Sequence, residues 1–465
     1  MCIVGIDLAT RAVHRAIIAT ERGDFVSPVL KFRTQQADLE GLYAKVQQHQ
    51  RSSAPLRVVM EATDIVWYPI AVFFQQRGAT VHVVTPQLSA ALGDFYHRQA
   101  HSDRLAARTL ARLPLVLRNH PKLYPWCFSG PDYLALQRGC RELERLVGSI
   151  SASKNRLQST DHLGWPDLGP RVFAKAFGPA ARWFRDHYYH PQHVVSVGES
   201  GLRDAWRVAK TYDGKEDWIA PLVALAQELI WLYAATGPYL DYEALAAAVH
   251  REQRRLRTYE QDAHAVRLHV TRPLYRKLHP SRNLETLKGV GQDGAAVYTG
   301  FIGQPQRFPS HRRFRGWHGM IPRSAQSGTQ ESKGLGISQA GPNPVKKFAY
   351  LNADVARRWD PQIAAIYYDQ MVHKGKHHNQ AVCACATHLL DRVRVILLED
   401  RPYELRAVDG TPVTASEAQA IINERYHVPQ EVRRRRTKRA REARAQRRAE
   451  RKYNRRRSRP SEVRG

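Results

Sequence analysis

The sequence predicts an α/β N-terminal domain built on a mixed sheet, followed by a mainly α-helical insert and a mainly α-helical C-terminal domain. Three observations predict this class. Short apolar runs typical of buried strands alternate with helical stretches over residues 3–84. From residue 131 the apolar residues follow a helical period among many charged ones. Over residues 314–341, a stretch rich in glycine, serine and arginine is flanked by helical patterns on both sides.

The N-terminal pattern predicts a sheet that begins with antiparallel strands. The elements expected are, in order, strands at Ile3–Leu8, Arg11–Thr20 and Phe25–Thr34, a helix at Gln36–Arg51, a strand at Leu56–Met60 that ends on Glu61, a helix at Ile65–Arg77, a strand at Thr80–Val84, and a helix opened by Ser102 and Asp103. Three antiparallel strands followed by right-handed crossovers give a mixed α/β sheet. We expect it to form a domain over residues 1–117.

Acidic residues stand where two of the expected strands end. Asp7 closes the first strand and Glu61 the fourth, and in this layout those two ends lie side by side. A carboxylate there is costly to bury unless a metal ion or a hydrogen-bond network compensates it. The sequence therefore predicts that Asp7 and Glu61 share a divalent cation, with Asp103 closing the site. The alternative is that each acid only forms a turn.

The charge of the chain indicates a polyanionic partner. The formal net charge is +29, from 72 Lys and Arg against 43 Asp and Glu. Residues 431–465 hold 17 basic and four acidic residues, a net +13, and this basic tail is expected to be disordered or helical only on a partner. Nucleic acid is the simplest such partner. Membrane attachment is the weaker alternative, because no apolar run is long enough to cross a bilayer and no lipidation motif is present.

The cysteines indicate a reducing compartment. There are only five, an odd and sparse set that argues against a disulfide framework and favours the cytosol. The chain is also expected to start with a strand rather than a signal peptide.

Beyond residue 117 the sequence predicts two more regions. Residues 131–275 look like a helical linker or coiled-coil insertion, with long charged helices around a segment rich in Trp, His, Pro and Gly. Its expected role is to hold two domains apart or to form an oligomer contact. Residues 283–400 form the third expected region. There, Gly289 and Gly291 separate two helical patterns, and a Gly-x-Gly turn that opens a helix exposes N–H groups suited to phosphate.

The stretch from Phe314 to Gly341 contains a candidate nucleophile. Ser327 precedes a glycine in an expected loop, with Arg323 and Lys333 near it in sequence. A serine hydroxyl attacks phosphorus when positive groups stabilise the developing charge and a neighbouring group accepts its proton. From the residues alone, the favoured interpretation is a polar loop that happens to contain a serine.

Two blocks of motifs resemble the transposases of the IS110 family, the bridge-RNA-guided recombinases. The first block is Gly-Ile-Asp at 5–7, Val-Met-Glu-Ala-Thr at 59–63, Val-Val-Thr-Pro at 83–86 and Ser-Asp-Arg-Leu-Ala-Ala at 102–107. It is similar to the family's RuvC-like, RNase H-fold domain with its Asp-Glu-Asp-Asp tetrad. The second comprises Leu-Lys-Gly-Val-Gly at 287–291, Gln-Ser-Gly at 326–328, Gly-Ile-Ser-Gln-Ala-Gly at 336–341 and Lys-Gly-Lys at 374–376. It is similar to the C-terminal transposase domain.

The resemblance implies a role for each candidate residue. Asp7, Glu61 and Asp103 correspond to the acids that hold Mg²⁺ or Mn²⁺, and Ser327 corresponds to the serine that forms a covalent phosphoserine link to DNA. The implied partners are donor and target DNA, a guide RNA, and further copies of the chain in a dimer or tetramer.

One position departs from the family pattern. The family has a second Asp three residues after the third acid, and here that residue is Ala106. Asp64 and Asp94 are the candidates to replace it. Ala106 therefore keeps two alternatives to the recombinase open: a non-catalytic DNA- or RNA-binding protein, and a RuvC-type nuclease that cuts with water.

Overall fold

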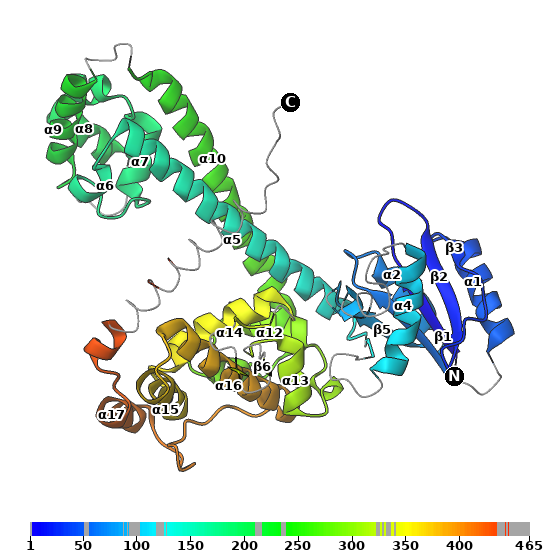
Figure 1. Cartoon of the computed structure of the whole chain (residues 1–465). Coiled ribbons are helices and arrows are strands. Elements are labelled where there is room, and N and C mark those ends of the chain that lie inside the picture. Colours follow the sequence, from blue (N-terminus) through cyan, green and yellow to red (C-terminus); the bar gives the residue numbers. More distant parts are fainter. Residues whose placement is uncertain are drawn as a thin grey trace, which may run out of the picture. The chain divides into compact units, whose positions relative to one another are not determined.

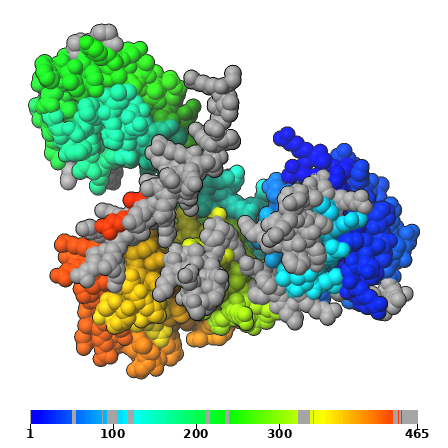
Figure 2. Space-filling model, viewed as in Figure 1, coloured from blue at the N-terminus to red at the C-terminus, as the bar shows by residue number. Residues whose placement is uncertain are grey.

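The computed structural model describes residues 2–50, 55–86, 88–90, 92, 103–117, 125–126, 128–209, 216–233, 239–321, 326–327, 330–331, 336–338, 341–434, 442 and 445. The chain forms two compact units, one of Met1–Pro131 with Ser281–Gly465 and the other of Asp132–Pro280. In Figure 2 the short helices of the second unit, coloured teal and green, form one rounded body. Most of the expected basic tail, from residue 435 on, lies outside the described part of the chain apart from two residues.

The N-terminal domain is the predicted mixed sheet (Figure 1). Its elements are β1 (Cys2–Asp7), β2 (His14–Thr20), β3 (Leu30–Phe32), α1 (Gln36–His49), β4 (Leu56–Glu61), α2 (Trp67–Gln75), β5 (Thr80–Val84) and α4 (Asp103–Val116). The strand order is β3-β2-β1-β4-β5. The first three strands pair antiparallel, whereas β4 runs parallel to both β1 and β5. The α/β class predicted from the sequence is confirmed.

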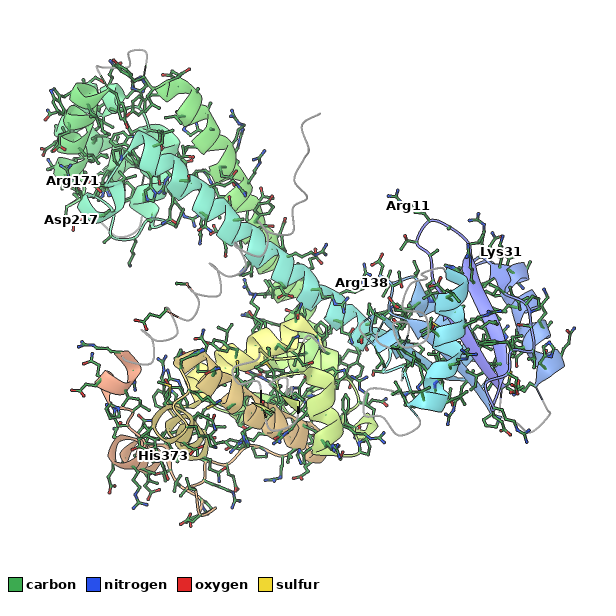
Figure 3. The ribbon with its side chains drawn as sticks, viewed as in Figure 1. Arg11, Lys31, Arg138, Arg171, Asp217 and His373 are labelled. Atoms are coloured by element: carbon green, nitrogen blue, oxygen red, sulfur yellow. The ribbon has the colours of Figure 1, made fainter. Side chains whose placement is uncertain are left out.

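The second and third strands are shorter than predicted. The third covers Leu30–Phe32 instead of Phe25–Thr34. Before it, the hydroxyl of Ser27 accepts the N–H of Ile18 at 3.0 Å, so a side chain replaces the ladder bond there. Pro28 follows, which has no N–H to donate. On this edge strand Lys31 is exposed (Figure 3), and a lysine there discourages edge-to-edge pairing.

Helices cover both faces of the sheet. Alternate residues of β1 and β4 pack against α1 and α2 on one face, where Leu42 and Phe74 are buried. The other residues, such as Ile3 and Val59, pack against α4. Because side chains alternate between faces along a strand, the odd-numbered positions of both strands, up to Asp7 and Glu61, belong to the α4 face.

Gly5 allows α4 to lie directly on the first strand. A Cβ built on Gly5 would come within 2.2 Å of the Ala107 carbonyl oxygen and 2.4 Å of the Ala111 nitrogen. Both neighbours are helix backbone, which cannot rotate away as a side chain can. The glycine in β1 thus sets how closely the helix that begins at Asp103 approaches the sheet.

Gly5→Ala is therefore expected to destabilise the protein by about 2–3 kcal/mol, because overpacking against backbone forces the helix off the sheet. The measurement is the free energy of unfolding from urea titration. Gly41→Ala is the matched control: Gly41 lies within α1 and a Cβ there would meet nothing within 4 Å, so this variant should gain stability from helix propensity. Equal stability of the two variants would contradict the close packing of α4.

The unit Asp132–Pro280 is helical. It contains α5 (Pro131–Gly164, with Pro131 just before the unit), α6 (Leu168–Arg171), α7 (Pro179–His187), α8 (Pro191–Val208), α9 (Ile219–Leu232), α10 (Tyr242–Val266), a π-helical turn (Arg267–Thr271) and α11 (Arg272–Leu278). Figure 1 shows α5 and α10 as two long neighbouring helices with the shorter helices at one end. The first long helix ends six residues later than predicted, at Gly164 instead of Gln158, and the predicted helix Ile219–Tyr242 is interrupted after Leu232.

Two kinds of contact hold this unit together. An aromatic core forms under the short helices, where Trp165 and Phe184 meet edge to face with ring centroids 4.8 Å apart. Along the long helices, the carboxylate of Glu252 accepts hydrogen bonds from Arg156 at 2.7 Å and from Ser153 at 2.5 Å. Figure 3 labels Arg171, whose guanidinium forms a 2.6 Å ion pair with Glu228 on the surface of this unit.

The C-terminal domain packs helices around α16. Its elements are a 3₁₀ turn (Asn283–Thr286), α12 (Gln292–Ile302), a second 3₁₀ turn (Pro305–Arg307), α13 (His311–His318), β6 (Gln326–Ser327), β7 (Gln330–Glu331), α14 (Asn343–Ala356), α15 (Pro361–Tyr368), a π-helical turn (Asp369–His373), α16 (His378–Glu399) and α17 (Ala415–Arg425). α16 contacts α13, α14 and α15. Its inward face is apolar, with Leu389, Leu390 and Val393 fully buried.

Candidate functional site

The two strand-end acids are neighbours in the sheet. The parallel register of β1 and β4 pairs Gly5 with Val59 and Ile6 with Met60, so that Asp7 and Glu61 follow as the next pair at the same edge. Both residues are partly exposed and lie on the α4 face. Since adjacent strands are about 4.8 Å apart, the two carboxylates leave the sheet within reach of one cation.

The first turn of α4 lies at the same edge of the sheet. Ala107 and Ala111 pack on Gly5, while a Cβ on Gly23 would approach the Leu115 side chain to 3.0 Å. Gly23 follows β2 at the edge where β1 begins, so α4 runs antiparallel to β1. Asp103 precedes Ala107 by about 6 Å along the helix, and Asp7 follows Gly5 by about 7 Å along the strand. The backbone of Asp103 therefore lies at the same end of the sheet as Asp7.

Ser89 is a residue at this site that the sequence did not single out. Its hydroxyl donates a hydrogen bond to the Glu61 carboxylate from the helical residues that follow β5. Such a bond fixes the orientation of a carboxylate and leaves its other oxygen for a ligand. The sequence signal was its place three residues after Pro86, shortly after the strand ends.

The donor set fits a hard divalent cation, because Mg²⁺ and Mn²⁺ are bound by carboxylate oxygens. Among the described side chains, no group of three His, Cys, Asp or Glu is near enough to form a complete metal site. Asp103 has its backbone in that part of the chain but not its side chain, and Asp94 lies outside it. Asp64 is exposed and adopts a left-handed conformation with φ of 45° in the loop after Glu61.

Ala106 occupies the position of the missing acid. It lies in the first turn of α4, three residues after Asp103, and is half-buried rather than enclosed. A position of this kind has room for a longer side chain, and a negative charge near a helix N-terminus is favourable.

The two ends of the segment that carries Ser327 are held by hydrogen bonds. Ser327 lies in the two-residue strand β6, paired antiparallel with β7, and its side chain is outside the described part of the chain, as are Arg323 and Lys333 altogether. The two ends of the segment meet where the Ser338 N–H donates to the Ile321 carbonyl at 3.0 Å. We call Met320, Ile321, Ser338 and Gly341 the loop base.

Several contacts fix the loop base to the helices. The Met320 N–H donates to Nδ1 of His318 at 3.0 Å, and its carbonyl accepts the Thr387 hydroxyl at 2.6 Å. Burial lowers the pKa of His318 to about 4, so the imidazole is neutral at pH 7 and Nδ1 can accept. Gly341, with φ of 80°, lies so close to His318 that a Cβ would come within 2.6 Å of its carbonyl oxygen. These contacts hold the loop base against α13 and α16.

The predicted Gly-x-Gly turn has a different role at each glycine. Gly289, at φ of 89°, packs against α14, where a Cβ would come within 2.5 Å of the Asn352 carbonyl oxygen. Gly291 is the residue before α12, and a Cβ there would meet nothing within 4 Å. The preceding element is a 3₁₀ turn instead of the expected helix end. Asp293, in the first turn of α12, places a negative charge at the helix end that was predicted to face phosphate.

The five-stranded mixed sheet with acids at two neighbouring strand ends is consistent with a RuvC-like DEDD fold, and the comparisons agree. Residues 4–163 match a family model for the DEDD transposase of IS110, described as a transposase. Residues 281–368 match the model described as the transposase IS116/IS110/IS902 family. Together the two matches cover just over half of the chain. The chain belongs to the IS110 family of transposases.

A curated relative shows the same similarity. The insertion element IS110 uncharacterized 43.6 kDa protein of Streptomyces coelicolor is 28% identical over 252 residues, which is 53% of this chain. The match spans 58% of the relative's own length. Neither family model matches residues 164–280, which hold α6 to α11, so most of the helical unit lies outside the two family-model matches.

None of the helices in the described ranges combines the length and the apolar character needed to cross a membrane.

Proposed function

We propose that this transposase cleaves and exchanges DNA strands through a covalent phosphoserine intermediate, with Ser327 as nucleophile and a divalent cation held by Asp7, Glu61 and Asp103. The observation that carries the proposal is the shared edge of β1 and β4, where Asp7 and Glu61 stand in register and α4 directs its first turn toward them. Trapping a covalent complex of protein and DNA in the presence of Mg²⁺ tests it.

Each group has a defined task in this proposal. Ser327 Oγ forms a bond to phosphorus, one phosphorus–oxygen bond to the sugar breaks, and the released sugar oxygen takes up a proton. When bound, Mg²⁺ or Mn²⁺ supplies charge neutralisation at the scissile phosphate and lowers the pKa of a coordinated hydroxyl. Asp7, Glu61 and Asp103 bind and orient that cation, and Ser89 holds the Glu61 carboxylate in place.

The proposed partners follow from charge and family. Donor and target DNA bind the basic chain, with phosphate contacts from Gly289, Gly291, Arg323 and Lys333, and a guide RNA selects the sequences. Arg11, exposed in the turn that follows Asp7 (Figure 3), adds a cation at the strand ends. The active form is a dimer or tetramer in the cytoplasm. Recovery of one discrete RNA with the purified protein would support guidance, whereas random cellular RNA would contradict it.

Two further functions rest on particular residues. Ala106 in place of an acid favours a DNA- or RNA-binding protein without catalysis. The strand-end acids alone favour a nuclease that cuts with metal-activated water and leaves Ser327 without a role. A covalent intermediate separates the recombinase from both.

Removal of residues 431–465 is expected to weaken nucleic-acid binding about equally for all sequences, because this segment carries a net charge of +13. Fewer counterions would be released, so the dependence of log K on log salt should become shallower by about 0.9 per lost duplex phosphate contact. The measurement is DNA affinity across a salt series for the full chain and for a chain ending at Gln430. An unchanged slope would show that the tail makes no phosphate contact.

A further inference from the structure

A cavity lies beside the loop base in the C-terminal domain. Its volume is about 350 Å³, which is within the range of small-ligand sites. Met320, Ile337 and Ser338 line it from the two ends of the Ser327 segment, and Lys346, Lys347 and Tyr350 line it from α14. The loop base that holds Ser327's segment is thus also one wall of the cavity.

Two lysine side chains line this cavity. Lys346 is only 9% exposed although lysine is rarely buried, and Lys347 beside it is exposed. Among the lining residues in the described part of the chain, none is an Asp or Glu. The first turn of α14 likewise contains no acidic residue.

The burial of Lys346 and its place in the helix both disfavour its charged form. Burial lowers the pKa of Lys346, which means that the folded protein disfavours its charged form. Lys346 also stands in the first turn of a 14-residue helix, where the helix dipole opposes a positive charge. A phosphate in the cavity would offset both costs, because it is attracted to the ammonium groups and to the helix end alike.

We infer that this cavity is a binding site for a DNA backbone phosphate, with Lys346 and Lys347 as its cationic groups. The site holds the strand next to the loop base and so positions it for the segment that carries Ser327. The inference rests on the proposed function only for the choice of DNA as the polyanion. Lys346 acts by binding the strand and takes no part in bond breaking.

Lys346→Met tests the inference through binding alone. Methionine keeps most of the length of the side chain and removes its charge. We expect the slope of log K against log salt for a 30-base-pair duplex of random sequence to become shallower by about 0.9. The melting temperature of the DNA-free protein should stay equal or rise, since a disfavoured buried charge has been removed. Lys346→Arg, which keeps the charge, should retain the wild-type slope.

The control variants distinguish a specific phosphate site from the general effect of removing one positive charge. Arg425→Gln removes one exposed charge from α17 of the same domain and should leave the slope unchanged. If Lys346→Met does not fold, Lys347→Met, at an exposed position, carries the same test. An unchanged slope in the folded lysine variants overturns the inference, as does a slope that changes for an RNA hairpin but not for the duplex.

Failure of this inference is distinguishable from failure of the proposed function. Loss of the covalent complex in Ser327→Ala together with unchanged DNA binding in the lysine variants would overturn the phosphate site alone. Cleavage that persists in Ser327→Ala together with a shallower salt slope in Lys346→Met would overturn the serine mechanism alone.

Discussion

Asp7→Asn is expected to reduce DNA strand exchange on the order of a thousandfold, while DNA and RNA binding stay near their wild-type values. Asparagine has nearly the shape of aspartate but lacks the charge that a divalent cation requires. Because Asp7 and Glu61 end neighbouring strands in register, the loss of either charge should weaken the same cation. The first measurement is Mn²⁺ affinity by electron paramagnetic resonance, which needs no turnover. Strand exchange with a supercoiled donor is the second.

Asp24→Asn is the matched control for this variant. Asp24 lies in the turn after β2, at the opposite edge of the sheet, and its carbonyl accepts the Thr20 N–H at 2.9 Å. The same substitution there should change neither Mn²⁺ affinity nor exchange. Wild-type Mn²⁺ affinity in Asp7→Asn would exclude Asp7 from the metal site.

Ala106→Asp restores a carboxylate at the position where the family pattern has an acid. The half-buried position in the first turn of α4 leaves room for a carboxylate, which the helix dipole would favour. Activity should be maintained or raised, with the unfolding midpoint unchanged. A clear loss of stability would show that Ala106 packs too tightly for a ligand.

The neighbouring positions of Asp7 and Glu61 could be predicted from the sequence because they depend on the strand pattern alone. Each strand ends on its acid, and the short connections leave few topologies, so the pairing of Asp7 with Glu61 follows from strand order. The closeness of α4 to the sheet was not predictable in the same way. It depends on Gly5 facing Ala107, two residues that are about a hundred positions apart.

The cavity in the C-terminal domain was harder to predict because it also depends on contacts between residues that are far apart in the sequence. The cavity beside the loop base is lined by Met320, Lys346 and Cys383, which come from three separate stretches of the chain. In the sequence Lys346 is one of many lysines, and only its burial distinguishes it. The region 165–241 was also difficult, since its buried tryptophans follow short helices and turns without one period.

Ser327→Ala is expected to abolish two products together: the covalent complex of protein and DNA, and the recombinant strand. If Ser327 Oγ attacks phosphorus, stopping the reaction midway leaves DNA attached to the protein in a form that survives denaturation in SDS. Alanine lacks the hydroxyl, so neither the complex nor the exchange that depends on it can form. The measurement is the radioactivity of labelled DNA that migrates with the protein on a denaturing gel.

Two neighbouring serines provide the controls. Ser324→Ala and Ser338→Ala remove hydroxyls from the same segment and should keep both products. At Ser338 the loop base is held by the backbone N–H to Ile321, which alanine retains.

The strand-end acids should affect the same chemical step as the serine. Asp7→Asn should fail to form the covalent complex even with Ser327 present, because the charge on the scissile phosphate is no longer neutralised. A water nucleophile predicts the opposite pattern, with cleaved DNA and no covalent protein in the wild type. Cleavage that persists in Ser327→Ala would therefore remove the serine from the mechanism and favour the metal-dependent nuclease.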